Sequence, residues 1–327
     1  MNRDFIVTKE HRRFAEFATA VRKEVTIGIC HGDAGVGKTL SARRYAHWDT
    51  LEPFIDEWGP RSEDDLKHYA AANRSRTAFY TPEVLPKPRD LMREIEFYRA
   101  KVGICVYEHL CATGKVTDRY VPRTIQYTEL LIIDEAERLT RTALELLRDL
   151  HDREHLAIIL IGMPGIDQRF RHYPQLYSRL GFAHRYRALG REELLFVLTR
   201  HWKRLGHELD PDDFTDAQAI AAIERITRGN FRLLERLFPQ INRVLKINQL
   251  ETITDDVIEA AASILVIGNW RHPGITEHRH RAIKPTGIPK RDTSRSAIAL
   301  WLRSLGGGVL QRSVAVLLPR PRRTGCR

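Results

Sequence analysis

The sequence predicts an α/β fold in which a doubly wound parallel sheet is followed by a helical domain and a basic tail. Short apolar runs rich in β-branched residues are typical of strands buried on both faces of a sheet. Through about residue 189 these runs alternate with helical patterns, which is the element order of a doubly wound sheet. Beyond that residue only helical patterns continue, and they predict a separate helical domain.

The apolar runs predict five strands, at residues 25–31, 76–81, 129–135, 156–162 and 182–189. Helical spacing of apolar residues predicts the helices between them, at residues 38–48, 88–103 and 140–152. A further amphipathic helix is predicted before the first strand, because Phe14, Phe17 and Val21 recur at helical spacing after Thr8, a candidate N-cap.

The rest of the chain is predicted as loop, helical domain and tail. Residues 49–74 contain Pro53, Gly59 and Pro60, and these punctuating residues predict a loop-rich stretch. The helices predicted for the helical domain are 191–205, 215–227, 230–245 and 254–266. The predicted parts are an N-terminal helix (1–24), an α/β domain (25–189), the helical domain (190–267) and the tail (268–327).

The net charge of +11 is concentrated in the predicted tail. Residues 268–327 hold 13 Lys+Arg and only 2 Asp+Glu, so they account for the whole excess. Their Pro-, Gly- and Arg-rich composition predicts disorder. Because the rest of the chain is formally neutral, a nucleic-acid surface on the folded body has to be argued from local residues.

Other bulk features exclude several classes of protein. No apolar run approaches the roughly 18 residues of a membrane helix, so no membrane partner is expected. The first 25 residues are charged throughout and lack the apolar core of a signal peptide. The cysteines Cys30, Cys105, Cys111 and Cys326 show no paired spacing, which indicates a reduced, cytoplasmic protein.

The first predicted strand leads into HGDAGVGKTL, which contains the pattern Gly-x4-Gly-Lys-Thr. Main-chain N–H groups of such a loop close around phosphates at a helix N-terminus, so ATP is the expected cofactor. The predicted nucleotide-binding residues are Gly32, Asp33, Ala34, Gly35, Val36, Gly37, Lys38, Thr39 and Leu40. Lys38 is expected to neutralise the β- and γ-phosphates, and the Thr39 hydroxyl to bind Mg²⁺.

The third predicted strand, in ELLIIDE, ends at Asp134 and Glu135. An adjacent carboxylate pair at this place favours ATP hydrolysis over phosphoryl transfer to a small molecule. We assign Asp134 to Mg²⁺, through water, and Glu135 to polarising the attacking water. The metal site predicted from the sequence is therefore Thr39 with Asp134.

Two arginine-containing motifs downstream extend this pattern. YPQLYSRLGF places Arg179 just before the last predicted strand, and TRGNFRLLERLF places Arg232 at the start of a helix. With the glycine loop and the Asp-Glu strand, the sequence resembles the AAA+ ATPases. The resemblance implies that Arg179 is a finger that reaches the γ-phosphate of a neighbouring subunit, and that Arg232 is a sensor in a helical lid. Arg169, Arg171 and Arg185 compete for the finger role.

Within the AAA+ ATPases, the chain is most similar to the transposition target-selection group of TniB and TnsC, with the Mu phage B protein as a relative. LLIIDEAERL, LIGMPGIDQRF and QLYSRLGF carry the match, which covers about Phe14 to Val266. Many AAA+ proteins place Asn or Thr at the end of the fourth strand to orient water, whereas this chain has Gly162 and Met163. The first sensor is therefore unassigned, and slow, assembly-coupled hydrolysis is expected.

The resemblance requires contact with double-stranded DNA, and one segment of the body offers it. TGKVTDRYVPRTIQYTE carries Lys115, Arg119 and Arg123 among hydroxyl side chains. This combination is typical of phosphate binding, although a solvated basic loop has the same composition.

The function expected from the sequence is an ATP-dependent AAA+ ATPase that oligomerises on DNA as a ring or filament and recruits or regulates a transposase. Two alternatives share the fold. One is a helicase loader of the IstB/DnaC type, which acts on a replicative helicase. The other is an AAA+ ATPase that acts only on protein partners in secretion or signalling, and DNA-stimulated ATPase activity would separate it from the first two.

Overall fold

The structure is a computed structural model that describes residues 5–59, 62–84, 86–116 and 123–265. The chain divides into two units, Met1–Asn269 and Trp270–Arg327, and every described residue belongs to the first. The predicted basic tail lies outside the described residues, as does Arg119 of the predicted DNA contact.

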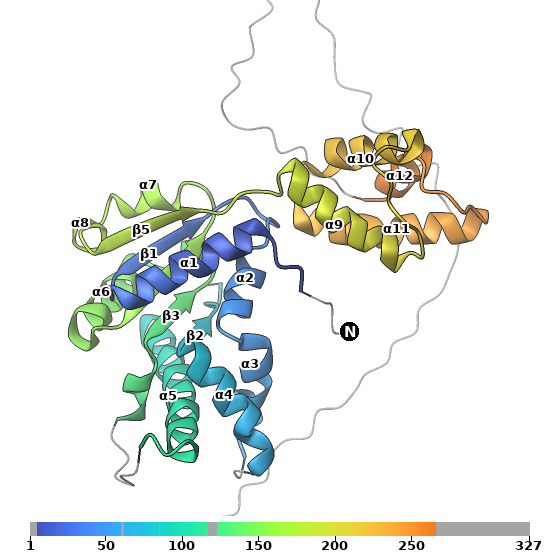
Figure 1. Ribbon diagram of the computed structural model, residues 1–327. Coiled ribbons are helices and arrows are strands. Elements are labelled where there is room, and N and C mark those ends of the chain that lie inside the picture. The colour runs from blue at the N-terminus through green and yellow to red at the C-terminus, as the bar shows by residue number, and fades with distance from the viewer. Residues whose placement is uncertain (1–4, 60–61, 85, 117–122, 266–327) are drawn as a thin grey trace, which may run out of the picture. The chain divides into compact units, whose positions relative to one another are not determined.

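A parallel sheet of five strands in the order β2-β3-β4-β1-β5 forms the centre of the first part of the chain (Figure 1). The strands are β1 (Ile27–His31), β2 (Thr77–Tyr80), β3 (Leu130–Ile133), β4 (Ala157–Gly162) and β5 (Leu180–Arg185). The predicted α/β class with a doubly wound parallel sheet is confirmed. Because all five strands run the same way, β1 and β3 end at the same edge of the sheet.

Helices connect these strands and continue after the sheet. Those around the sheet are α1 (Lys9–Lys23), α2 (Lys38–Tyr45), α3 (Trp48–Asp56), α4 (Leu66–Ser75), α5 (Pro88–Ala112), α6 (Arg141–Glu154), α7 (Ile166–Phe170) and α8 (Pro174–Tyr177). Short 3-10 turns are η1 (Glu63–Asp65), η2 (Thr124–Tyr127) and η3 (Ala136–Arg138). The later helices are α9 (Arg191–Arg204), α10 (Phe214–Thr227), α11 (Phe231–Asn248) and α12 (Asp255–Ser263).

Helix α1 lies along the sheet and contacts β1, β4 and β5 (Figure 1). Thr8 caps it as predicted, because its hydroxyl accepts a hydrogen bond from His11 N at 3.1 Å. Gly28 of β1 permits the close approach: a Cβ there would lie 2.6 Å from Val21 Cγ2 and 2.8 Å from Phe17 Cζ. The predicted apolar stripe therefore packs directly on the strand that precedes the glycine loop.

The predicted loop-rich stretch from 49 to 74 is wrong, because the structure forms α3 and α4 there. Trp48, Leu51 and Ile55 of α3 are buried at helical spacing, although Pro53 lies inside the helix. Proline removes one helical hydrogen bond. Burying a large apolar side chain contributes about 1.5–3 kcal/mol, so three buried side chains outweigh that loss.

The buried apolar residues form two separate clusters. One surrounds the sheet and includes Ile132 and Ile159. The other lies among α9 to α12 and is built on Trp202, Phe238 and Ile241. The predicted helical content after residue 190 is confirmed, whereas the domain boundary near Leu189 stays a prediction because both clusters belong to the same unit.

None of the helices in the described part of the chain combines the length and the apolar composition that crossing a lipid bilayer requires.

Candidate nucleotide-binding site

The glycine loop joins the end of β1 to the start of α2. Gly35 and Gly37 have φ angles of +81° and +111°, a left-handed region that glycine adopts without steric cost. Lys38 is buried, and its Nζ donates to the carbonyl oxygens of Gly32 at 2.6 Å and Asp33 at 2.8 Å. Burial lowers the pKa of Lys38. An anion at this helix N-terminus would stabilise its charged form, as the predicted phosphate contact requires.

Tyr186, just after β5, forms a wall of this loop. Its N–H donates to His31 O at 2.8 Å, and its hydroxyl is hydrogen-bonded to Ser41 Oγ at 2.8 Å. A Cβ at Gly32 would lie 2.3 Å from Tyr186 O, so only glycine fits at the first position of the motif. Burial raises the pKa of Tyr186 to about 12, which keeps the phenol neutral. Tyr186 was not predicted from the sequence, because no local pattern links it to the loop.

The two predicted magnesium ligands lie together. Thr39 Oγ1 donates to Asp134 Oδ2 at 2.6 Å, and Asp134 is buried at the end of β3. Asp134 N donates to Tyr80 O at 2.9 Å, which fixes the backbone on the side of β2. A hydroxyl and a carboxylate fit Mg²⁺, which takes few protein oxygens and fills its other positions with water and phosphate. When bound, the ion would neutralise phosphate charge.

Glu135 follows Asp134 in a left-handed conformation, with φ +49°. This region is uncommon for non-glycine residues, and such backbone concentrates at functional sites. The Glu135 carboxylate forms an ion pair with Arg138, whose Nη1 also donates to Pro82 O at 2.6 Å. The predicted water-polarising group is therefore neutralised here, and Arg138, which sequence analysis missed, would have to release it before it accepts a proton.

The N-terminus of α11 contacts the glycine loop. Asn230 Nδ2 donates to Ala34 O at 2.8 Å, and Arg232 N donates to Gly35 O at 2.9 Å. A Cβ at Gly35 would lie 2.7 Å from Asn230 Oδ1 and 2.8 Å from Arg232 Cβ. Gly35 thus serves this contact as well as the loop conformation. Arg232 was predicted from the sequence to lie at the nucleotide, whereas Asn230 was not, although its N-cap position before the helix was a signal for it.

Arg179 does not lie with these residues. It directly precedes β5, and its carbonyl accepts a hydrogen bond from Ile27 N, at the opposite end of β1 from the glycine loop. Its guanidinium donates to Asp152 Oδ1 at 2.8 Å, and this hydrogen bond lowers the pKa of Asp152. The structure therefore brings together Lys38, Thr39 and Asp134 at one edge of the sheet and leaves Arg179 at the other.

Comparison with known proteins decides the family. A family model of the AAA domain matches residues 21–170. A Staphylococcus aureus protein described as a potential ATP-binding protein is 41% identical over 275 residues, which cover 82% of this chain and 98% of that protein. The chain belongs to the AAA+ ATPase family. The predicted family and nucleotide binding are confirmed at this level, and the transposition group stays a prediction.

Two solved structures are similar to this AAA+ ATPase. One is the RuvB Holliday junction branch migration motor of Thermotoga maritima, which is 17% identical with a TM-score of 0.48 over 80% of this chain and 70% of that one. The other is the ORC2 protein of Aeropyrum pernix in its ADP form, 15% identical with a TM-score of 0.46 over 80% and 71%.

The first sensor of this AAA+ ATPase stays unassigned at the end of β4. A Cβ at Gly162 would lie 2.3 Å from Ile166 Cδ1 and 2.9 Å from Glu137 Oε2, so Asn or Thr there would require the ends of these two side chains to move. Arg169, a competitor for the finger, donates to the carbonyls of Glu137 at 2.7 Å and Leu139 at 2.5 Å. Its guanidinium thus holds the segment after the Asp-Glu pair in its own chain.

The other finger competitors and the predicted DNA contacts lie on the surface. Arg171 and Arg185 are exposed, and Arg185 ends β5 opposite His31, on the glycine-loop side of the sheet. Lys115 and Arg123 are exposed on either side of a stretch outside the described residues. Exposure is what a phosphate contact needs, and these two residues remain predictions.

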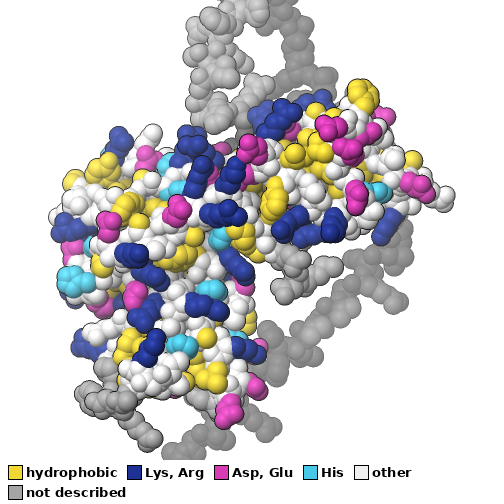
Figure 2. Space-filling view, viewed as in Figure 1, with side chains coloured by type: hydrophobic (Ala, Val, Ile, Leu, Met, Phe, Trp, Pro, Cys, Tyr) yellow, Lys and Arg dark blue, Asp and Glu magenta, His cyan; other side chains and the backbone are white. Residues whose placement is uncertain are grey.

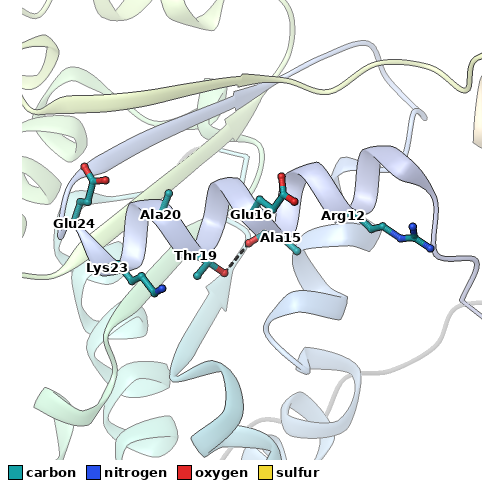
Figure 3. A pocket seen from close by; sticks show the side chains of 7 residues that line it. All are labelled: Arg12, Ala15, Glu16, Thr19, Ala20, Lys23 and Glu24. Carbon is teal, nitrogen blue, oxygen red and sulfur yellow. Dashed lines mark hydrogen bonds between the residues drawn. The ribbon is translucent and has the colours of Figure 1, made fainter.

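A second surface feature is an open depression on the outward face of α1 (Figure 3). The residues that line it come from this helix and its C-cap: Arg12, Ala15, Glu16, Thr19, Ala20, Lys23 and Glu24. It carries two basic and two acidic side chains and includes no residue of the glycine loop. Basic and acidic side chains are also interspersed over the face of the molecule in Figure 2.

Proposed function

We propose that this AAA+ ATPase oligomerises on double-stranded DNA as a ring or filament, with ATP between subunits, and recruits or regulates a transposase. The observation that carries the assembly is the place of Arg179. β1 has five residues, so its two ends lie roughly 15 Å apart at about 3.3 Å per residue. An arginine at the far edge is therefore better placed to contact the nucleotide of a neighbouring subunit than the nucleotide of its own subunit.

The surroundings of Arg179 favour such a transfer. Its side chain is exposed and held by Asp152, which also accepts a hydrogen bond from Arg148 Nη1 at 2.7 Å. Because Asp152 keeps a second cation, Arg179 can leave for a phosphate without stranding the carboxylate. A planar guanidinium then meets the γ-phosphate of the adjoining subunit.

DNA binding is supported by local charge. Lys115 and Arg123 are exposed, and the segment from 268 to 327 carries 13 Lys+Arg against 2 Asp+Glu. Lysine and arginine contacts to phosphates supply sequence-independent affinity that falls with salt. The transposase as partner rests on the motif resemblance alone, and slow turnover, expected without a first sensor, suits a switch whose ATP-bound state is the working state.

The test is to image the full-length protein with duplex DNA and a nonhydrolysable ATP analogue, and to measure ATPase activity with and without DNA. We expect rings or filaments on DNA only with the analogue, and a rate that rises with DNA. Assemblies that form equally well without DNA, at an ATPase rate that DNA does not change, would favour the alternative in which the ATPase acts only on protein partners. Retention of a replicative helicase, and not a transposase, by the DNA-bound assembly would favour a helicase loader.

A further inference from the structure

A pocket of about 440 Å³ opens at the edge of the sheet opposite the nucleotide site. It lies where the chain enters β1, β3 and β4, since Val25, Glu129 and His155 all line it just before those strands. Four arginines and two glutamates line the pocket, which gives a formal net charge of +2: Arg22, Arg99, Arg123, Arg153, Glu129 and Glu154.

Three of the four arginines, Arg22, Arg99 and Arg153, have an ion-pair partner. Arg22 donates to Ser75 O at 2.5 Å and lies 3.7 Å from Glu129, and Arg153 is ion-paired with Asp149. Both lie in the last turn of a helix, where a cation complements the partial negative charge of the helix C-terminus. Their presence needs no ligand.

Arg99 is different. Its side chain on α5 is 1% exposed, and Nη2 donates to Glu154 Oε2 at 2.6 Å. Its Nε and Nη1 are buried and have no hydrogen-bond partner among the residues that the structure describes. A buried charged donor without an acceptor is costly and uncommon in native proteins. Arg99, which lines the pocket, therefore holds buried donors that no described residue satisfies.

Arg123 adds a cation whose side chain is unpaired among the described residues. It is exposed and lines the same pocket, and its side chain makes no hydrogen bond or ion pair with any residue that the structure describes. Its carbonyl accepts a hydrogen bond from Gln126 N at 3.0 Å. The remaining acidic residue is largely offset, because Glu129 is also paired with Arg76 at 2.7 Å. The pocket therefore offers two guanidinium groups to one anion with several acceptor oxygens.

We propose that this pocket binds a phosphate group, with Arg99 and Arg123 as its ligands. Arginine forms forked, charge-assisted hydrogen bonds with phosphate, and a doubly charged group matches the net charge of the lining. The phosphate belongs either to the DNA backbone or to a small phosphorylated molecule. The site does not depend on the proposed function, because it lies at the edge of the sheet opposite the glycine loop.

The test uses inorganic pyrophosphate and the full-length Lys38→Ala protein without magnesium, so that the glycine loop contributes little phosphate affinity. Arg123→Ala and Arg99→Lys are added to it separately. Arg93→Ala is the matched control, because Arg93 is an exposed arginine on the same helix that pairs with Asp90 away from the pocket. Calorimetry measures the affinity of each protein for pyrophosphate.

We expect Arg123→Ala and Arg99→Lys each to weaken pyrophosphate binding about tenfold or more, the effect of one charge-assisted hydrogen bond. Arg93→Ala should bind unchanged. Equal affinity in all three proteins would overturn the proposal. If Arg99→Lys fails to fold, the pyrophosphate affinity of Arg123→Ala alone decides the test, because Arg123 is exposed.

A second arm identifies the source of the phosphate. A short duplex that displaces pyrophosphate in an Arg123-dependent way identifies the ligand as DNA backbone. A duplex that leaves Arg123-dependent binding intact identifies a small phosphorylated molecule. ATP-dependent assembly on DNA is followed in the Arg123→Ala and Arg99→Lys proteins that keep Lys38. Because assembly and pyrophosphate binding are measured separately, either one can fail without the other. The pocket and the proposed function are therefore tested independently.

Discussion

Replacing Asn230 tests whether the contact between α11 and the glycine loop senses nucleotide. Asn230 makes two side-chain hydrogen bonds: Oδ1 caps α11 by accepting from Leu233 N at 3.2 Å, and Nδ2 donates to Ala34 O at 2.8 Å. An N-cap contributes about 1 kcal/mol, and a typical hydrogen bond about another. We therefore expect Asn230→Ala to lower the free energy of unfolding by about 2 kcal/mol.

Asn230→Asp separates the two roles. Aspartate caps a helix as well as asparagine, so α11 keeps its cap. The donor to Ala34 O is replaced by a negative charge beside the loop that holds the phosphates. A carboxylate within about 5 Å of a phosphate charge, at an effective dielectric constant of about 20, costs roughly 3 kcal/mol. We expect ATP affinity to fall by at least about tenfold, and the free energy of unfolding to fall by only about 1 kcal/mol, from the lost hydrogen bond to Ala34 O.

Thr254→Ala is the control, because Thr254 caps α12 by accepting from Val257 N at 3.4 Å and contacts no residue of the loop. It should lose about 1 kcal/mol of stability and keep its ATP affinity. The assays are urea denaturation and titration with a fluorescent ATP analogue. Wild-type ATP affinity in Asn230→Asp would refute the reasoning, because the contact would then be structural only.

Three further predictions follow from single side chains. Arg138→Ala should speed ATP hydrolysis at unchanged ATP affinity, because it frees Glu135; a slower rate would mean that Arg138 orients the carboxylate. Burial lowers the pKa of His201 from 6.5 to about 4, so stability present above pH 6.5 should fall, by up to about 3 kcal/mol, as the pH drops toward 4. Denaturation at pH 7.5 and 5 should show a smaller loss in His201→Phe, and an equal loss would contradict the assignment. Val25 is a β-branched residue at φ +49°, so Val25→Gly should raise the free energy of unfolding by about 0.5–1 kcal/mol; an unchanged or lower denaturation midpoint would exclude strain there.

The glycine loop and the Asp-Glu strand were predictable because their information is local. Gly35 and Gly37 are needed for backbone conformation, and Lys38 and Thr39 follow at fixed spacing in the next helix. Asp134 could be placed beside them because parallel strands end at one edge of a sheet, and its bond to Thr39 confirms that inference.

The partners of these residues were not predictable, because they come from distant parts of the chain. Asn230 and Ala34 are 196 residues apart, and Tyr186 and Ser41 are 145 apart. No periodicity or spacing connects such pairs; only the packing of one element on another does. For the same reason α3 was not predicted from the sequence. Pro53 signals a break in the helix, but the burial of Trp48 and Ile55 stabilises the helix nevertheless.

The most direct test of the account mixes two inactive proteins, Lys38→Ala and Arg179→Ala, on duplex DNA and measures ATP hydrolysis. An arginine finger supplied in trans contributes about 10³ to 10⁵ in rate. Each variant alone should therefore be inactive, and Arg179→Ala should still bind ATP. In the mixture, the Arg179→Ala subunit supplies an intact glycine loop and its Lys38→Ala neighbour supplies the arginine, so the account predicts partial recovery of activity. Normal hydrolysis by Arg179→Ala alone, or a mixture that stays inactive, would contradict a nucleotide site shared between subunits.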